Sequence, residues 1–192
     1  TEGAGEEGQK NWVELLRLLR KYRGRRPLDG LVVLVPADDL LSKSDQELQE
    51  QASNVRQVID HLHDELKFRF PVYLLVSKCD LVEGFVDFFK GIPAQRRNEI
   101  LGWSHGEPNE GDPRRLIPLG FRRVVQRLQA YRLEMLARIA KKTHARRLFF
   151  FTENFRRLEK PLAVFADILF LEDPANEPPV FRGFYFTSGT QG

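Results

Sequence analysis

The chain has 192 residues, of which 42% are hydrophobic, and its 30 basic side chains nearly balance its 27 acidic ones, for a net charge of +3. This composition excludes an intrinsically disordered chain, and the near-balance of charge does not demand a polyanionic partner. A single cysteine excludes a disulfide framework and fits a reducing compartment, and no apolar run approaches the roughly 20 residues of a membrane-spanning helix.

The chain is predicted to consist of a short flexible segment followed by one folded domain. Residues 1–10 start with glycine- and glutamate-rich sequence and are predicted to be flexible, whereas residues 11–192 are predicted to form a single α/β domain. Apolar residues at helical spacing predict a helix over 11–24. The apolar run 30–35, bounded by glycine and proline, predicts a buried strand.

The middle of the domain is predicted to be mainly helical. Ser44 begins a capping-box pattern, followed by a long amphipathic helix that ends before Pro71. The apolar run 72–76 predicts a second buried strand. A helical insertion is predicted over about 84–142, in which residues 102–116 form a surface loop rich in glycine, proline and charge.

The last part of the chain returns to alternating strands and helices. Residues 147–151, with three consecutive phenylalanines, are predicted to form a third strand, and residues 153–173 a helix that Pro161 kinks or divides. Residues 181–189 are predicted to form the last strand. This order predicts an α/β fold with a mostly parallel sheet flanked by helices, whose ligands would bind beyond the carboxyl ends of the strands.

A candidate base-binding motif, Ser77-Lys78-Cys79-Asp80, directly follows the second predicted strand. Guanine presents two adjacent N–H donors that one carboxylate, here Asp80, can accept together. The apolar stem of Lys78 can lie over the base, and the hydroxyl of Ser77 can brace the loop. The alternative is a purely structural loop, in which Asp80 caps the next helix.

The phosphate-binding half of a nucleotide site is missing from this sequence. No segment matches the G-x-x-x-x-G-K-[ST] loop whose backbone amides hold phosphates, and no strand ends in Asp-x-x-Gly to supply a magnesium partner. His61 and His63 lie two residues apart and would not share a helix face, so no metal site is predicted. The chain is therefore expected to have no catalytic residues and to bind no cofactor by itself.

Three segments resemble the cytoplasmic domain of the TssM, or IcmF-like, family of type VI secretion membrane subunits: "RPLDGLVVLVPADDLL", "LKFRFPVYLLVSKCDLVEGFVDFF" and "PPVFRGFYFTSGTQ". The resemblance implies a partial P-loop GTPase-like domain at the cytoplasmic face of the bacterial inner membrane. It also implies that a phosphate loop, where present, lies upstream of this chain, with GTP or ATP as the nucleotide of the full-length protein. Other membrane-complex and baseplate subunits would be its partners.

Two details bear on base recognition within this resemblance. Ser77 stands where threonine is usual in the family, which keeps the hydroxyl. GTPases present a backbone amide to the base from a loop after a neighbouring strand, and "FTENF" is expected to be that loop here. Glu153 would then repel the carbonyl oxygen of guanine, which counts against guanine specificity.

Three functions follow as hypotheses. The preferred one is a docking or scaffold domain of a type VI secretion inner-membrane complex, with a degenerate or truncated nucleotide-binding fold. The second is a guanine-nucleotide switch read by Ser77, Lys78 and Asp80. The third is a nucleic-acid-binding module, which the basic clusters around 17–26 and 138–147 suggest but no recognition motif supports, so no specific nucleic acid is expected.

Overall fold

The computed structural model describes residues 2–93, 99–106, 111–136, 142–173 and 178–189. The elements follow in the order α1 (Glu2–Tyr22), β1 (Leu31–Pro36), α2 (Ala37–Ser42), α3 (Asp45–Leu66), β2 (Pro71–Ser77), η1 (Cys79–Leu81), α4 (Phe85–Gly91), β3 (Gly102–Ser104), α5 (Pro113–Leu136), α6 (Lys142–Arg156), α7 (Glu159–Leu169) and β4 (Val180–Phe186).

The four strands form one sheet in the order β1-β2-β4-β3. Strands β1, β2 and β4 are parallel, so that Leu34 lies beside Leu75 and Leu75 beside Tyr185, whereas β3 runs antiparallel along the outer edge of β4. The prediction of an α/β fold with a mostly parallel sheet flanked by helices is therefore confirmed. The carboxyl ends of the three parallel strands lie at one edge of the sheet.

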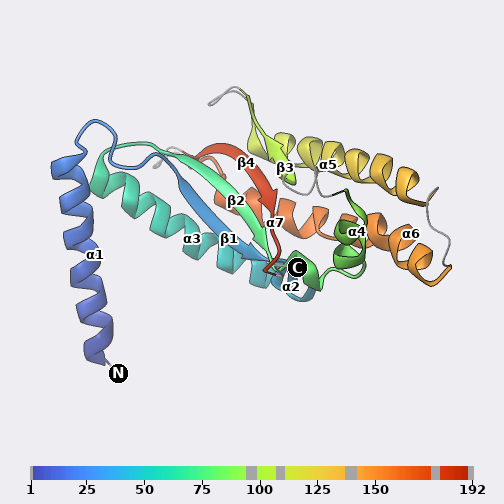
Figure 1. The fold of residues 1–192 in the computed structure, drawn as a ribbon. Helices are drawn as coiled ribbons and strands as arrows, with labels where there is room; N and C mark the ends of the chain where they lie inside the picture. The colour runs from blue at the N-terminus through green and yellow to red at the C-terminus, as the bar shows by residue number, and fades with distance from the viewer. Residues whose placement is uncertain (1, 94–98, 107–110, 137–141, 174–177, 190–192) are drawn as a thin grey trace.

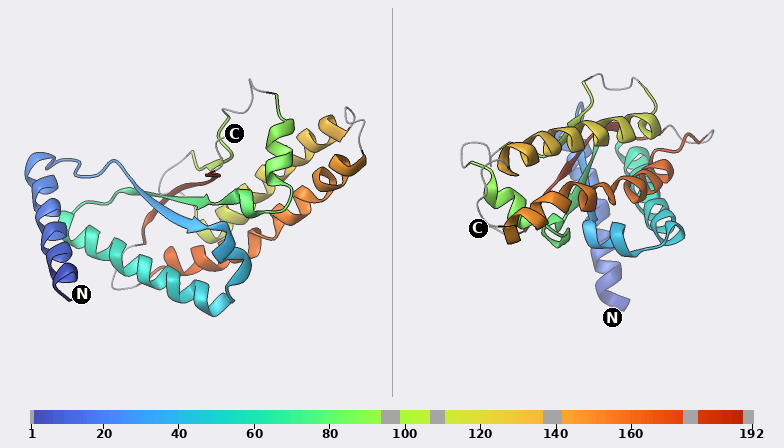
Figure 2. Two further views of the ribbon diagram at one scale, coloured as in Figure 1. Left: turned by 60° about the horizontal axis from the view of Figure 1, so that its bottom comes forward. Right: turned by 90° about the vertical axis from the view of Figure 1, so that its right-hand side faces the viewer.

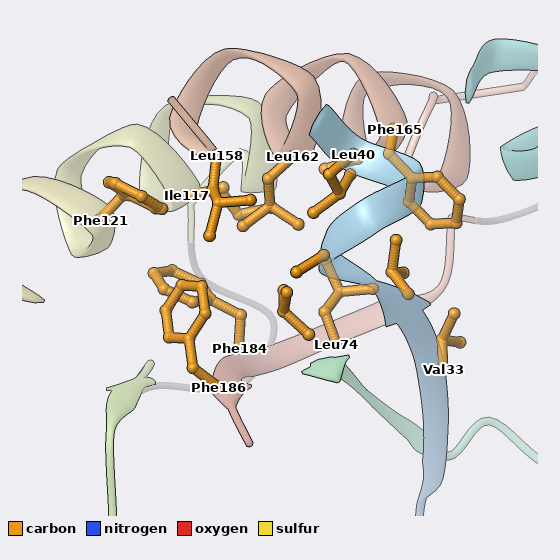
Figure 3. Packing of buried hydrophobic residues seen from close by; sticks show 14 of the residues in the cluster. Val33, Leu40, Leu74, Ile117, Phe121, Leu158, Leu162, Phe165, Phe184 and Phe186 are labelled. Atoms are coloured by element: carbon orange, nitrogen blue, oxygen red, sulfur yellow. The ribbon is translucent and has the colours of Figure 1, made fainter. Parts of the chain in front are cut away.

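One face of the sheet carries the core. Val33, Leu74 and Phe184 alternate with exposed or half-buried neighbours, as period-2 side-chain geometry requires. The helices α3, α5, α6 and α7 cover this face (Figures 1 and 2). Figure 3 shows side chains of α5 and α7, with Leu40 of α2, pointing at those of the strands.

Among the described elements, no helix crosses the centre of the opposite face of the sheet (Figure 2). We call it the open face, formed by Val32, Leu34, Tyr73, Leu75 and Tyr185. Val32 is 55% and Leu34 61% exposed, which is unusual for a strand of a parallel sheet. A hollow of about 1340 Å³ lies over part of this face, between α4 and β3.

The two long N-terminal helices differ in how well the sequence predicted them. The capping box of α3 is present, with the Glu47 amide donating to Ser44 Oγ and the Glu47 carboxylate accepting from the Ser44 amide. In contrast, α1 begins at Glu2, not Asn11, so residues 2–10 extend the predicted helix. Helix α1 stands across one end of the sheet and packs on α3 through Leu16 and Leu19 (Figure 1). The predicted boundary at residue 10, between a flexible segment and the folded domain, remains a prediction.

The strand predicted over 147–151 is wrong, because this segment lies inside α6. The three phenylalanines look like a strand by composition. However, the buried residues described in this helix are Leu148, Phe151, Thr152 and Phe155, and their spacing is that of one helix face. Phe149 and Phe150 remain about half exposed, so only Phe151 of the three phenylalanines belongs to the core.

The surface loop predicted over 102–116 is only partly correct, because it contains strand β3 and because α5 already begins at Pro113. The three residues of β3 are too few to show a strand pattern in the sequence. Gly102 lets the backbone approach β4, since a Cβ there would clash with the Phe184 carbonyl. Trp103 fills the space that Gly120 leaves on α5. The helix predicted over 153–173 is divided, but at residues 157–158, since α6 ends at Arg156 and Pro161 lies in the first turn of α7.

The remaining boundaries of the helical insertion also shift. The helical insertion was predicted to run to about residue 142. Helix α5 ends at Leu136, and residues 137–141 lie outside the described part of the chain. Among the described helices, none is both long enough and apolar enough to cross a membrane.

Candidate functional site at the carboxyl ends of the strands

The predicted motif Ser77-Lys78-Cys79-Asp80 lies at the carboxyl end of β2, at the centre of the sheet. Strand β2 ends because the apolar run stops at Ser77, and Lys78 then adopts a left-handed backbone conformation with φ 55°. A short 3₁₀ turn, η1, follows directly. Because β1 and β4 are parallel neighbours of β2, the segments after those two strands flank the loop on either side.

Cys79 holds the loop in place. Its thiol is buried and contacts the Val76 carbonyl with an Sγ–O distance of 3.4 Å, and its amide donates to the Thr187 carbonyl at 3.0 Å. Burial raises the pKa of the Cys79 thiol to about 12, so the thiol stays neutral. Among the described residues, the Ser77 hydroxyl makes no hydrogen bond, so the bracing predicted for Ser77 comes from Cys79 instead.

Lys78 turns toward the segment after β1. Its ammonium nitrogen lies 3.0 Å from Asp38 Oδ2, in the first turn of α2. The hydrogen bond from Lys78 is the main reason that the pKa of Asp38 is lowered. Both side chains are well exposed, so this ion pair contributes little to stability and can open to admit a ligand.

Asp80 turns toward the segment after β4, where Ser188 Oγ donates to Asp80 Oδ1 at 3.0 Å. The Thr187 amide donates to the Val76 carbonyl at 2.8 Å, which holds residues 187 and 188 against the loop. The structure therefore places the three predicted residues in one loop, with Lys78 and Asp80 reaching opposite neighbouring strands.

The expectation for "FTENF" is wrong. Residues 151–155 lie in α6, where Glu153 pairs with Arg156 at 3.6 Å, and the loop beside Asp80 is the one containing Thr187 and Ser188. The argument against guanine that rested on Glu153 therefore no longer applies. The small residues of "TSG" at the end of the last predicted strand were the available sequence signal, but the false strand at 147–151 obscured it.

The space around Asp80 is small and acidic. The cavity that Asp80 shares with Glu83, Gly84 and Asp87 has a volume of about 220 Å³, below the usual range for a small-molecule site. Thr187 and Ser188 also line the larger hollow over the open face, so the loop adjoins that hollow. Among the described residues, no group of His, Cys, Asp and Glu is arranged to hold a metal ion.

Comparisons with known proteins agree with the resemblance seen in the sequence. A family model described as "IcmF-related N-terminal domain" matches residues 5–192. A protein of Pseudomonas aeruginosa, "Type VI secretion system component TssM1", is 35% identical over 184 residues, which cover 94% of this chain and 17% of that protein. No solved structure matches the chain.

Proposed function

Because the chain belongs to the IcmF-related N-terminal domain family, we propose that it is a docking domain of a type VI secretion inner-membrane complex. In this proposal the domain lies at the cytoplasmic face of the bacterial inner membrane, and its nucleotide-binding fold is degenerate or truncated. Its partners are other membrane-complex and baseplate subunits. The chain spans only 17% of its curated relative, so these statements about the whole protein rest on the family and on the geometry below.

The open face is the observation that carries this proposal. Parallel sheets are normally covered by helices on both faces, because their strands are apolar on both sides. Here Val32 and Leu34 lie on β1, which pairs with β2 alone among the described strands, and both are more than half exposed. A helix with an apolar side, contributed by another subunit of the complex, would complete the layer that this sheet lacks.

The test is to place a charge on the open face of the parent protein. We expect a Val32→Asp, Leu34→Asp double variant to lose co-purification with the other secretion subunits, because an apolar partner would bury unpaired carboxylates. Leu133→Asp is the matched control, since Leu133 on α5 is 65% exposed, as against 61% for Leu34. Normal assembly by the double variant, with its fold intact by circular dichroism, would refute docking through this face.

A nucleotide switch remains the second candidate, because the structure favours it in one respect. Asp80 carries a carboxylate beside the Thr187–Ser188 segment, and Lys78 lies on the other side of the same loop. This arrangement would read a guanine base once phosphate-binding residues from outside these 192 residues are added. GTP is then the nucleotide of the parent protein, and ATP is the alternative if the loop does not read guanine.

Calorimetry distinguishes the two candidates. The switch predicts that a longer chain with the upstream region binds GTP, and that Asp80→Ala weakens this binding by about tenfold or more, as expected for losing a charge-assisted bidentate hydrogen bond. The 192-residue chain alone is expected to bind neither GTP nor ATP. Unchanged GTP affinity in the Asp80→Ala longer chain would reject base reading and leave the docking proposal untouched.

A further inference from the structure

A further cavity lies at the opposite end of the sheet from the candidate loop. It has a volume of about 440 Å³ and lies at the amino ends of β2 and β4, where Pro71 and Val180 begin those strands. Its lining residues are Arg26, Asp29, Arg69, Pro71, Tyr73, Val180 and Arg182. Three of these seven residues are arginines, and none of them takes part in the docking or base-reading proposals.

The three arginines come from three separate segments and are each anchored. Arg26 precedes β1, and its Nε lies 3.0 Å from Asp29 Oδ1. Arg69 precedes β2 and donates from Nη2 to the Pro178 carbonyl. Arg182 lies in β4, at a shift in the pairing register with β2, and donates from Nη1 to the Gly106 carbonyl at 3.2 Å. Anchored guanidinium groups lose less rotamer freedom when they bind a ligand.

The lining carries an excess of positive charge. The lining residues include three arginines and one carboxylate, and that carboxylate, Asp29, is shared with Arg23 outside the cavity at 2.9 Å. The hydrogen bond from Arg23 is the main reason that the pKa of Asp29 is lowered, so Asp29 stays ionised near neutral pH. Three arginines and one aspartate give the lining residues a net charge of +2, compared with +3 for the whole chain.

We propose that this cavity binds a terminal phosphate group. One arginine fork satisfies a carboxylate, whereas a phosphate monoester or pyrophosphate has three or more peripheral oxygens that several guanidinium groups can share. Tyr73 also lines the cavity, and its side chain carries a hydroxyl donor of the kind that phosphate accepts. The phosphate can belong to a small soluble compound or to a lipid headgroup such as phosphatidic acid, and the chemistry of recognition is the same.

The test uses the full 192-residue chain and inorganic pyrophosphate in titration calorimetry. We expect saturable binding at one site that weakens by about tenfold or more in Arg182→Lys, which keeps the charge but loses the fork, and in Arg26→Ala. Arg26 is exposed, so its removal should leave the fold intact, and a thermal melt checks this. Arg123→Ala, an exposed arginine on α5, is the control and should bind like the wild type.

Vesicles identify the source of the phosphate. Phosphatidylcholine vesicles with added phosphatidic acid should sediment the wild type but not Arg182→Lys if the ligand is a lipid headgroup, and should sediment neither if it is a soluble phosphate. The proposal is overturned if pyrophosphate does not bind saturably, or if Arg123→Ala weakens binding as much as the cavity variants. It is also overturned if an acidic peptide or an oligonucleotide binds and pyrophosphate does not compete.

Discussion

Cys79 lies between Lys78 and Asp80, two of the three candidate base-binding residues, and acts as a fixed, neutral anchor. Its sulfur is fully buried, and its pKa is raised to about 12 by that burial. A thiol reacts with disulfide reagents only as a thiolate that the reagent can reach. The native loop should therefore protect this residue, although its neighbours Lys78 and Asp80 are partly exposed.

We expect Cys79 to react with Ellman's reagent at pH 8 far more slowly in the native chain than in urea. Its raised pKa also means that stability is full below pH 9 and falls as the pH rises from 9 toward 12, because only the unfolded thiol ionises in that window. Equal labelling rates in the folded and unfolded chains would contradict the buried position. The chain has one cysteine, so the signal needs no correction.

His63 predicts a second pH effect, on the acid side. Its ring packs against Phe70 with 4.5 Å between centroids, and burial is the first cause of its lowered pKa, with Arg69 and Arg56 adding to it and Asp60 and Asp64 opposing it. The neutral ring is therefore favoured in the folded state. Stability should fall as the pH drops below about 6.5, where the unfolded histidine gains a proton.

The measurement is the urea midpoint at pH 7.5 and at pH 5.5. We expect His63→Leu to reduce the loss of stability between these pH values. The exposed His61, two residues earlier, provides the control, and His61→Leu should leave the loss nearly unchanged. A similar pH response in the wild type and His63→Leu would show that other groups are responsible.

At the scale of the elements, α3 and α7 are joined by a buried arginine. Arg56 is 8% exposed, and its Nη1 donates to the carbonyls of Leu169, the last residue of α7, and Leu171, just beyond it, at 3.1 and 2.8 Å. Its Nε pairs with Asp60 at 2.8 Å. The side chain thus satisfies carbonyls at the end of α7 that the helix itself cannot.

We expect Arg56→Leu to lower the free energy of unfolding by about 2–4 kcal/mol, because Asp60 and two carbonyls lose their partner. Lys160→Met is the control, since Lys160 pairs with Asp45 between the same two helices but is 77% exposed. Its removal should change stability by less than about 1 kcal/mol. If the two substitutions lowered the free energy of unfolding in urea equally, the claim that the buried Arg56 contributes more than the exposed Lys160 would be refuted.

The contact between β3 and α5 gives a prediction with an unusual sign. Replacing a glycine inside a helix by alanine normally stabilises by about 1 kcal/mol. At Gly120, however, a Cβ would lie 2.5 Å from Cδ2 of Trp103. We therefore expect Gly120→Ala to destabilise by about 1–3 kcal/mol, as overpacking does.

Thermal unfolding and tryptophan fluorescence together check this expectation. Gly120→Ala should lower the melting temperature and change the emission of Trp103, one of two tryptophans in the chain. Gly106→Ala is a control, because a Cβ at Gly106 meets nothing within 4 Å. A melting temperature of Gly120→Ala at or above that of the wild type would mean that Trp103 does not occupy this space.

At the scale of the whole molecule, the sheet is protected on one side only. The core face is covered by helices, whereas the open face and the outer edge of β1 present apolar side chains and backbone groups together. Such an edge is a template for pairing with another chain. The isolated domain is therefore expected to self-associate unless a partner covers it.

We expect the apparent mass of the isolated chain, measured by light scattering, to rise with protein concentration. A Val32→Lys, Leu34→Lys variant should stay monomeric over the same range, because edge lysines oppose strand pairing. Leu133→Lys, on the helical side, should still associate. A monomeric wild type at high concentration would show that the open face tolerates water.

Local patterns in the sequence were sufficient for much of the fold. The Ser44 capping box and the apolar runs that became β1 and β2 act over a few residues, so their structure follows from neighbours along the chain. The position of Asp80 at the end of a central strand followed from the same runs. The IcmF-related resemblance, carried by three short segments, was confirmed in the same way.

Contacts between distant segments could not be derived from those patterns. The partner of Asp80 is Ser188, 108 residues away, and the partner of Lys78 is Asp38, 40 residues away. Which loop lies beside Asp80 depends on strand order, and strand order depends on whether residues 147–151 form a strand or a helix. Helix packing decides between strand and helix for this segment, because Phe151 and Phe155 lie on one helix face and are buried in the same core.

The amino-acid sequence by itself determined the family, the α/β class and the position of the Ser77-Lys78-Cys79-Asp80 loop. The tertiary structure alone decided that one face of the sheet is uncovered and that three arginines share a cavity at its far end. The physical reason is the range of the interactions involved. Periodicity and capping depend on adjacent residues, whereas exposure and charge clustering depend on which segments the folded chain brings together.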